Sequence, residues 1–130
     1  MKPRKVEVLL DSIACLYGAF HDPDSLAYRL RNPLLIKSYS TPGKHITNDE
    51  GLRQFDSFLS GYTACCYDLV KKVSGASRAR IATTDSLATL LCLYGITERG
   101  GQRKVVNFLR RALADDTITD ETPISYFNTI

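Results

Sequence analysis

Tryptophan is absent from this 130-residue sequence, and His and Met are scarce, with two copies and one copy respectively. The two histidines, His21 and His45, stand far apart, and no two of the four cysteines have Cys-x-x-Cys spacing. A structural zinc ion needs Cys and His ligands at set spacings, so the sequence predicts neither a metal nor another cofactor. We interpret the thiols as free, small apolar side chains within the fold; they belong to Cys15, Cys65, Cys66 and Cys92.

Long apolar runs and signal-peptide features are also missing. No run approaches the ~18 apolar residues that a membrane span needs. The chain begins with a basic segment, but Glu7 and Asp11 interrupt the apolar stretch that follows, and the core of a signal peptide would not carry these acids. We therefore expect a cytoplasmic protein that has no membrane among its partners.

Recognisable catalytic motifs are absent as well. The sequence contains no Gly-x-Ser-x-Gly, no P-loop and no His-Glu-x-x-His. Asp22 and Asp24 flank Pro23, and helix capping accounts for this pair better than metal binding does. The sequence therefore predicts a protein that is not an enzyme and has no catalytic residues.

Helical periodicity is what the sequence does contain. Apolar residues recur three and four positions apart through most of the chain, which predicts an all-α fold, a single helical bundle of about five helices. The predicted helices cover residues 4–20, 25–31, 47–74, 84–94 and 102–114. We expect residues 1–114 to form the bundle domain and residues 115–130 to form an acidic C-terminal tail or strap, docked by Ile124, Tyr126 and Phe127.

The third predicted helix is the longest and is expected to be the spine of the domain. Thr47 and Glu50 have the spacing of a capping box at its start, and Gly75 stands where a left-handed C-cap belongs. Between them, a seam of apolar residues runs from Leu52 to Val73. A helix of about 26 residues would be ~39 Å long, enough to span the whole domain.

The other helix ends carry weaker signals. Asp24 is a candidate N-cap for the second helix. Gly95 is a candidate C-terminal residue for the fourth, with Ile96 packing back on Leu91. The fourth helix is apolar on nearly all sides, so we expect it to be central, and Gly100-Gly101 are expected to delay the start of the fifth.

Positive charge is concentrated in one third of the chain. Residues 71–114 carry nine Lys and Arg against two acids, a net of +7, whereas residues 1–70 carry eight of each sign. Residues 115–130 carry four acids and no base. A strongly basic segment on a balanced body is typical of a surface that binds polyanions. The predicted nucleic-acid-binding residues are Lys71, Lys72, Arg78, Arg80, Arg99, Arg103, Lys104, Arg110 and Arg111.

Four of these residues are expected to form a ridge on the fifth helix. Arg103 and Arg110 are seven positions apart, as are Lys104 and Arg111, so each pair lies on one side of the helix. Such a ridge would be about 10 Å long and suits successive phosphates of a nucleic-acid strand. Two alternatives stay open: ordinary solvated Lys and Arg, and a protein–protein module whose basic ridge meets an acidic partner. Composition does not separate DNA from RNA.

A helix-turn-helix is a third alternative. The fourth helix, the turn at residues 95–97 and the fifth helix match that layout, with Glu98, Arg99, Gln102 and Arg103 at the start of a recognition helix. The glycine pair at 100–101 weakens this prediction, because base-reading residues need a rigid helix.

On the predicted spine helix, Tyr67 lies off the apolar seam one turn before Lys71 and is a candidate for stacking on a base.

The sequence resembles the small subunit of class 1 CRISPR effector complexes. The features that carry the resemblance are the predicted spine helix, Arg78 and Arg80 after it, and the ridge on the fifth helix. The resemblance covers the whole chain in outline. It implies a non-catalytic five-helix bundle that works inside a larger ribonucleoprotein assembly, beside the backbone that bears the guide RNA. Its partners would be nucleic acid, other protein subunits and further copies of itself. The basic surface would hold the target or displaced DNA strand along a positive groove.

Overall fold

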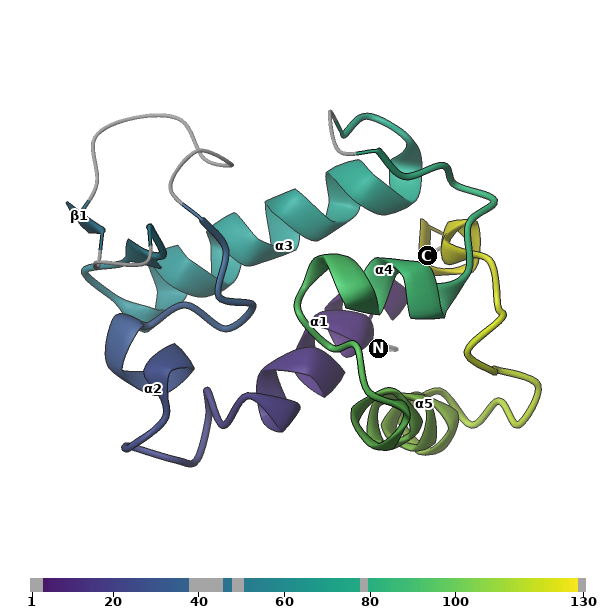
Figure 1. The fold of residues 1–130 in the computed structure, drawn as a ribbon, viewed down its shortest axis with the longest axis horizontal. Helices are drawn as coiled ribbons and strands as arrows, with labels where there is room; N and C mark the ends of the chain where they lie inside the picture. The colour runs from purple at the N-terminus through teal and green to yellow at the C-terminus, as the bar shows by residue number, and fades with distance from the viewer. Residues whose placement is uncertain (1–3, 38–45, 48–50, 78–79, 129–130) are drawn as a thin grey trace.

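The computed structural model describes residues 4–37, 46–47, 51–77 and 80–128, and it confirms the predicted all-α fold (Figure 1). Five α-helices and one 3-10 helix account for most of these residues. They are α1 (Lys5–Leu16), α2 (Leu26–Leu30), α3 (Phe58–Ser74), α4 (Leu87–Leu93), α5 (Arg99–Leu113) and η2 (Ile124–Asn128). The strands β1 (Ile46–Thr47) and β2 (Arg53–Gln54) form a two-residue antiparallel ladder. No helix in the described part of the chain is long and apolar enough to cross a membrane.

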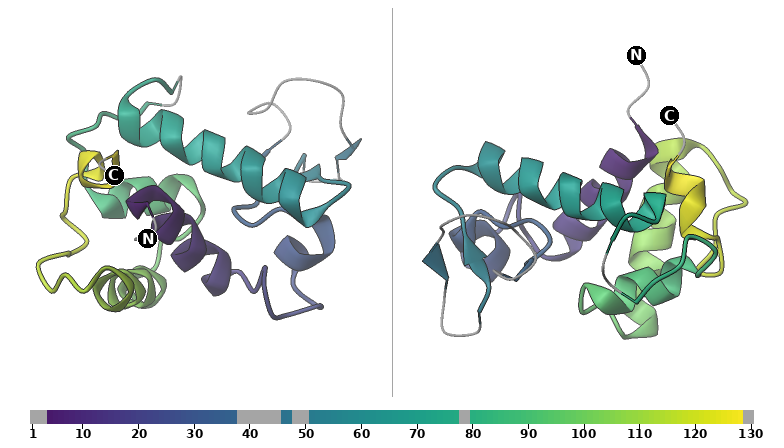
Figure 2. Two further views of the ribbon diagram at one scale, coloured as in Figure 1. Left: turned by 180° about the vertical axis from the view of Figure 1, so that it is seen from behind. Right: turned by 90° about the horizontal axis from the view of Figure 1, so that it is seen from above.

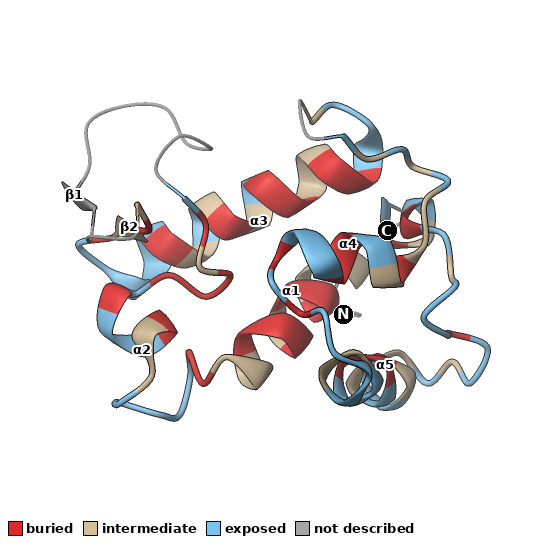
Figure 3. Cartoon of the chain, viewed as in Figure 1, coloured by how far each residue is buried: buried red, intermediate tan, exposed pale blue. Residues whose placement is uncertain are grey.

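The helices pack around α1, which contacts α3, α5 and η2. Figures 1 and 2 show α3 and α5 on opposite sides of the molecule, with α1 and α4 between them. The side chains of Leu9, Leu10 and Ile13 on α1 are fully buried, and buried residues lie where α1, α3 and α4 face the interior (Figure 3). The helix α4 buries Leu87, Leu90 and Leu91, but Leu93 is 47% exposed, so α4 has a solvent side that the sequence analysis did not predict.

The predicted spine helix begins later than its periodicity indicated. The helix α3 starts at Phe58, after the N-cap Ser57, whose side chain accepts a hydrogen bond from the Ser60 amide. Thr47 lies in β1, so it does not begin a capping box, and Glu50 lies outside the described residues. The side chains of Leu52 and Phe55 are buried, as the apolar seam predicts, but the backbone of these residues is extended instead of helical. This segment is extended because its amides bond to the chain before it, including Arg53 N–H to the Ile36 carbonyl at 3.1 Å.

The helix ends follow the glycine signals better than the predicted N-caps. Gly75 and Gly95 adopt φ values of +85° and +87°, and the Ile96 amide donates to the Leu91 carbonyl at 2.9 Å, which confirms both predicted C-termini. The N-cap of α2 is Ser25 instead of Asp24, since the Ser25 hydroxyl accepts from the Tyr28 amide. The pair at 100–101 does not delay the fifth helix, because α5 begins at Arg99. The helix α1 ends at Leu16, four residues before the predicted end.

The C-terminal segment closes one side of the core. Ile118, Ile124 and Phe127 are buried, which confirms the predicted docking for Ile124 and Phe127, while Tyr126 is partly buried. The segment is held to the start of α4 by backbone hydrogen bonds at 2.8 Å from the Leu87 and Ala88 amides to Thr122 and Asp120. The C-terminal segment therefore contributes Ile118, Ile124 and Phe127 to the same core as the helices.

The Asp115 carboxylate fixes the start of this segment. It accepts hydrogen bonds from the Thr117 hydroxyl, the Tyr126 hydroxyl and the Thr117 amide, which lower its pKa from 3.8 to about 2. Because the folded-state pKa is depressed, the stabilisation is complete above pH ~4 and is lost as the pH falls toward 2.

We expect Tyr126→Phe to raise the pKa of Asp115, as measured by NMR titration of its carboxyl carbon. Tyr28→Phe, at an exposed tyrosine, is the control; an unchanged Asp115 pKa in Tyr126→Phe would contradict the contact.

Candidate nucleic-acid interface

The charged surface is built on α5, whose two sides differ sharply in chemistry. Val105, Val106 and Leu109 are buried and attach the helix to the core, where α5 packs on α1. The rest of the helix carries all of its charge. Between Arg99 and Leu113 there are five Lys and Arg and no Asp or Glu, a net of +5. The hydrophobic side therefore fixes the helix with its cations toward solvent.

Three arginines of α5 line a hollow of about 420 Å³ on one side of the helix. They are Arg99, Arg103 and Arg110, and the opposite wall is formed by Thr119 and Asp120 of the C-terminal segment. The Nε–H of Arg110 donates to the Ile118 carbonyl at 2.7 Å, which ties the helix to that wall. The hollow thus has three cations and one acid around it.

A second hollow, of about 400 Å³, lies on the other side of α5. Its cations are Lys104 and Arg111, its far wall comes from α1, and it also contains the apolar side chains of Leu16 and Phe108. Asn107 lines both hollows. The ridge predicted from sequence is therefore divided: Arg103 and Arg110 face one hollow, and Lys104 and Arg111 face the other.

None of the five α5 cations forms an ion pair with a described residue. The ion pairs in the described part of the chain are Arg4–Glu7 at 2.9 Å and Lys72–Asp68 at 2.7 Å. A cluster of five cations without an acidic partner repels itself. An anionic ligand would relieve that repulsion, and the surface is exposed to receive one.

The remaining predicted contacts lie elsewhere, at the end of α3 and beyond. Lys71 is half-buried with its Nζ 5.0 Å from the Tyr67 ring centroid, Arg80 is exposed, and Arg78 lies outside the described residues. Figures 1 and 2 place this end of α3 across the molecule from α5. The predicted residues therefore form two groups instead of one, and Tyr67, 61% exposed, belongs to the group at α3.

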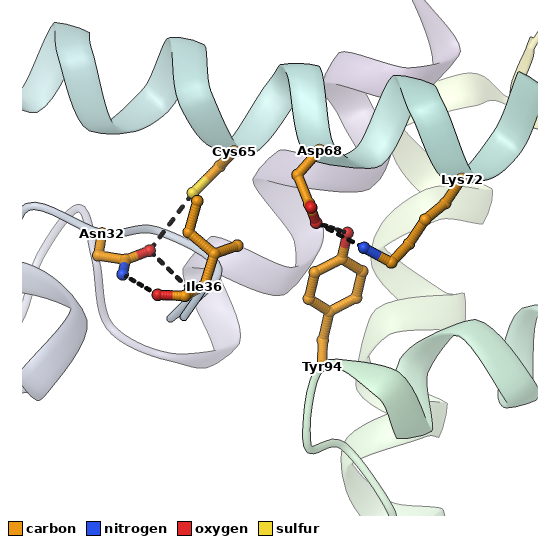
Figure 4. A network of polar contacts seen from close by, with 6 residues as sticks. All are labelled: Asn32, Ile36, Cys65, Asp68, Lys72 and Tyr94. Atoms are coloured by element: carbon orange, nitrogen blue, oxygen red, sulfur yellow. Dashed lines mark hydrogen bonds and ion pairs between the residues drawn. The ribbon is translucent and has the colours of Figure 1, made fainter. Parts of the chain in front are cut away.

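Lys72 is a structural residue. It is 9% exposed, and its ammonium group donates to the Asp68 carboxylate at 2.7 Å. The Tyr94 hydroxyl donates to the same oxygen at 2.6 Å, so the three side chains form a closed buried cluster (Figure 4). Burial, followed by the adjacent Asp68 charge and hydrogen bond, raises the pKa of Tyr94 well above 10. Since its charge faces the interior, we leave Lys72 out of the interface.

The helix-turn-helix layout is present in outline. In Figure 1, α5 is seen end-on while α4 runs across the view, and the two are joined by the turn at residues 95–97. Of the predicted base-reading residues, Glu98, Arg99 and Arg103 are exposed. Gln102 is half-buried and its side-chain amide donates to the Ile96 carbonyl at 3.1 Å, so it stabilises the turn.

Asn107, Thr119 and Asp120 also line the first hollow, although they are not among the residues predicted from the sequence. Asn107 carried one signal that could have found it, since it is the polar residue midway between the two charged pairs of α5. Thr119 and Asp120 carried none, because their place in the wall depends on how the C-terminal segment returns to α4.

The cysteines and acids offer no second site among the described residues. All four thiols are free, and burial raises the pKa of Cys65 to about 12, which keeps it protonated. No three His, Cys, Asp or Glu side chains of the described residues come together in a group that could hold a metal ion.

Comparison with known proteins adds no relative: no family model, no curated protein and no solved structure matches this chain. The resemblance to CRISPR small subunits stays a prediction that rests on the sequence features given above. What bears on the function of this protein is therefore the geometry and charge of α5.

Proposed function

We propose that this protein binds nucleic acid, without catalysing a reaction, through contacts between the cations of α5 and phosphate groups. The observation that carries the proposal is the set of five Lys and Arg on one helix, without an acid on that helix and without an ion pair to a described residue. Each phosphate that such a cation neutralises releases condensed counterions, which makes binding strong at low salt and weak at high salt.

The surroundings of α5 support phosphate binding over a merely solvated surface. Both hollows have walls held by hydrogen bonds or by helix packing, so the cations stand around fixed concave surfaces. Binding to a fixed surface costs less conformational entropy than binding to freely rotating side chains on a convex one. Asp120 opposes the three arginines in one hollow, and a phosphate there would lie on the helix side.

The larger assembly expected from the resemblance is part of this proposal. In that setting the protein would hold a nucleic-acid strand next to other protein subunits, including further copies of itself. The two most exposed large apolar side chains of the described residues, Leu59 at 74% and Tyr67 at 61%, both lie on α3. Side chains of this kind are enriched at protein contacts, which supports an assembly.

The charge-removing variant Arg99→Gln/Arg103→Gln tests the proposal. We expect it to lower the affinity for labelled nucleic acid by at least about tenfold at low salt, and to reduce the slope of log affinity against log salt by ~2, one for each phosphate-binding cation removed. Fluorescence anisotropy with random-sequence single-stranded DNA, duplex DNA and RNA at several salt concentrations measures both quantities.

The control is Arg29→Gln/Arg31→Gln, which removes the same charge from two exposed arginines at the end of α2 that are not among the predicted nucleic-acid-binding residues. Its affinity and salt slope should stay near those of the wild type. Equal losses in both variants would mean that net charge, and not α5, governs binding. If the wild type binds none of the three nucleic acids at low salt but binds an acidic polypeptide, the protein–protein alternative is correct.

A further inference from the structure

The exposed side of α5 consists of three lines of residues along the helix axis. At 100° per residue, Arg99, Arg103 and Arg110 share one line and Lys104 and Arg111 share another. Gly100 and Asn107, seven positions apart, form an uncharged line between them. The hollows agree with this wheel, because each charged line faces its own hollow and Asn107 lines both. The helix is therefore a rib with an uncharged crest and cations on both flanks.

A rib with this charge pattern matches the shape of one nucleic-acid surface. The major groove of B-form DNA is ≈ 12 Å wide and has a phosphate backbone along each edge. An α-helix with its side chains has a diameter of ≈ 10–12 Å, so it fills that groove and its flanks face the two backbones. A single strand offers one backbone and would use one flank. The major groove of an RNA duplex is too narrow and deep to admit the helix.

From this match, and resting on the proposed function, we infer that α5 occupies the major groove of duplex DNA. One phosphate backbone lies in the hollow with Arg99, Arg103 and Arg110, and the other lies in the hollow with Lys104 and Arg111. The crest of the helix, with Asn107, faces the base edges.

The crest has the properties that close approach requires. A Cβ added at Gly100 would meet no atom within 4 Å, so the surface around it is open. Asn107 is exposed, and its side-chain amide forms no hydrogen bond with a described residue. An Asn amide can pair with the N6 and N7 atoms of adenine in the major groove. Gln102, one of the residues that the sequence favoured for this role, is engaged with the Ile96 carbonyl.

The helix α5 is also anchored at both ends, which keeps it in place when it contacts base edges. Its start is fixed by the turn after α4, where the Ile96 amide bonds to the Leu91 carbonyl and the Tyr17 hydroxyl donates to the Tyr94 carbonyl. Its other end is fixed by the bond from Arg110 to the Ile118 carbonyl. Because both ends are anchored to the core, the crest can enter a groove without losing its position relative to the two hollows.

Binding to three matched ligands tests the groove. We expect a DNA duplex to bind at least about tenfold more tightly than either its single strand or an RNA duplex of the same sequence, at equal salt. Dimethyl sulfate then reports the groove, since it methylates guanine N7 in the major groove and adenine N3 in the minor groove. We expect protection of guanine N7 and not of adenine N3.

Two outcomes would overturn this inference and leave the proposed function standing. One is equal or tighter binding of the single strand or the RNA duplex, with the weaker binding of Arg99→Gln/Arg103→Gln retained. The other is protection of adenine N3 alone. Absence of binding to every nucleic acid would instead contradict both proposals.

Asn107→Ala tests the crest separately from the flanks. Duplexes that the wild-type protein binds are first selected from a random-sequence pool. We expect Asn107→Ala to bind the selected sequence about tenfold more weakly than the wild type does. Its affinity for random duplex and its salt slope should be unchanged, since no cation is removed. Asn128→Ala, at an exposed asparagine of η2, is the matched control. Equal affinity of Asn107→Ala and the wild type for the selected sequence would overturn the assignment of Asn107 to the base edges.

Discussion

Gly61→Ala is expected to destabilise the protein by about 3 kcal/mol or more, because the added methyl group has no room. A Cβ at this position of α3 would lie 1.7 Å from the carbonyl oxygen of Arg31 and 2.9 Å from its carbonyl carbon. It would also lie 3.2 Å from the Cδ2 atom of Phe55. Backbone atoms cannot rotate away as a side chain can, so α3 or the chain after α2 would have to move.

Movement of that segment is opposed by the buried side chain that follows it. Asn32 has no exposed surface, and its side-chain amide donates to the carbonyls of Ile36 and Arg53 at 2.9 and 2.8 Å. Its oxygen accepts from the Ile36 amide at 2.9 Å and from the Cys65 thiol at 3.4 Å (Figure 4). Moving Arg31 away from position 61 would break bonds that no water can replace.

Chemical denaturation followed by circular dichroism measures the effect of Gly61→Ala. The control is Gly100→Ala on α5, where a Cβ meets no atom within 4 Å. Since Ala is favoured over Gly in helices by up to ~1 kcal/mol, this control should be neutral or stabilising. If the denaturation midpoint of Gly61→Ala equals that of the wild type, α3 does not approach the Arg31 carbonyl closely and the steric explanation is wrong.

Asp68→Ala is the second large effect, with an expected loss of about 3–5 kcal/mol. The substitution leaves the Lys72 ammonium group and the Tyr94 hydroxyl without their shared acceptor. The Lys72 side chain is 11% exposed, so water replaces little of the lost interaction. An unpaired buried charge costs more than the original pair contributes.

Replacing the whole cluster distinguishes this explanation from a simple loss of packing. The triple variant Asp68→Leu/Lys72→Met/Tyr94→Phe removes the buried polar groups together and is expected to recover most of the stability. Thermal unfolding of both variants measures the difference, and Lys71→Met, at the half-buried neighbour, is the control for loss of a lysine. If the triple variant is no more stable than Asp68→Ala, the loss comes from packing and the charge argument is wrong.

The same triple variant tests the assignment of Lys72 as a structural residue. Its affinity for nucleic acid should equal that of the wild type, because the ammonium group of Lys72 faces Asp68 and Tyr94 instead of solvent. A loss of affinity with an intact fold would return Lys72 to the binding surface.

Periodicity predicted the number of helices, but not where the third begins. Leu52 and Phe55 continue the apolar seam of α3 and are buried, as a helix would bury them. They reach the core from extended backbone, because the amides of Arg53 and Phe55 bond to the carbonyls of Ile36 and Leu30. Apolar spacing records which residues are buried, and it does not record which distant carbonyls compete for the backbone amides.

The sequence by itself determined the all-α class, the C-terminal glycines at 75 and 95 and the sign of the charge on α5. These features depend on local chemistry, namely helical spacing, the positive φ that glycine tolerates and the count of ionisable side chains. Only the tertiary structure decided which charges face solvent. Lys71 and Lys72 are adjacent in the sequence, yet the packing of α3 turns one toward the surface and the other toward Asp68 and Tyr94. It also placed Asn107 between two hollows, because their far walls come from α1 and the C-terminal segment, which long-range packing brings to α5.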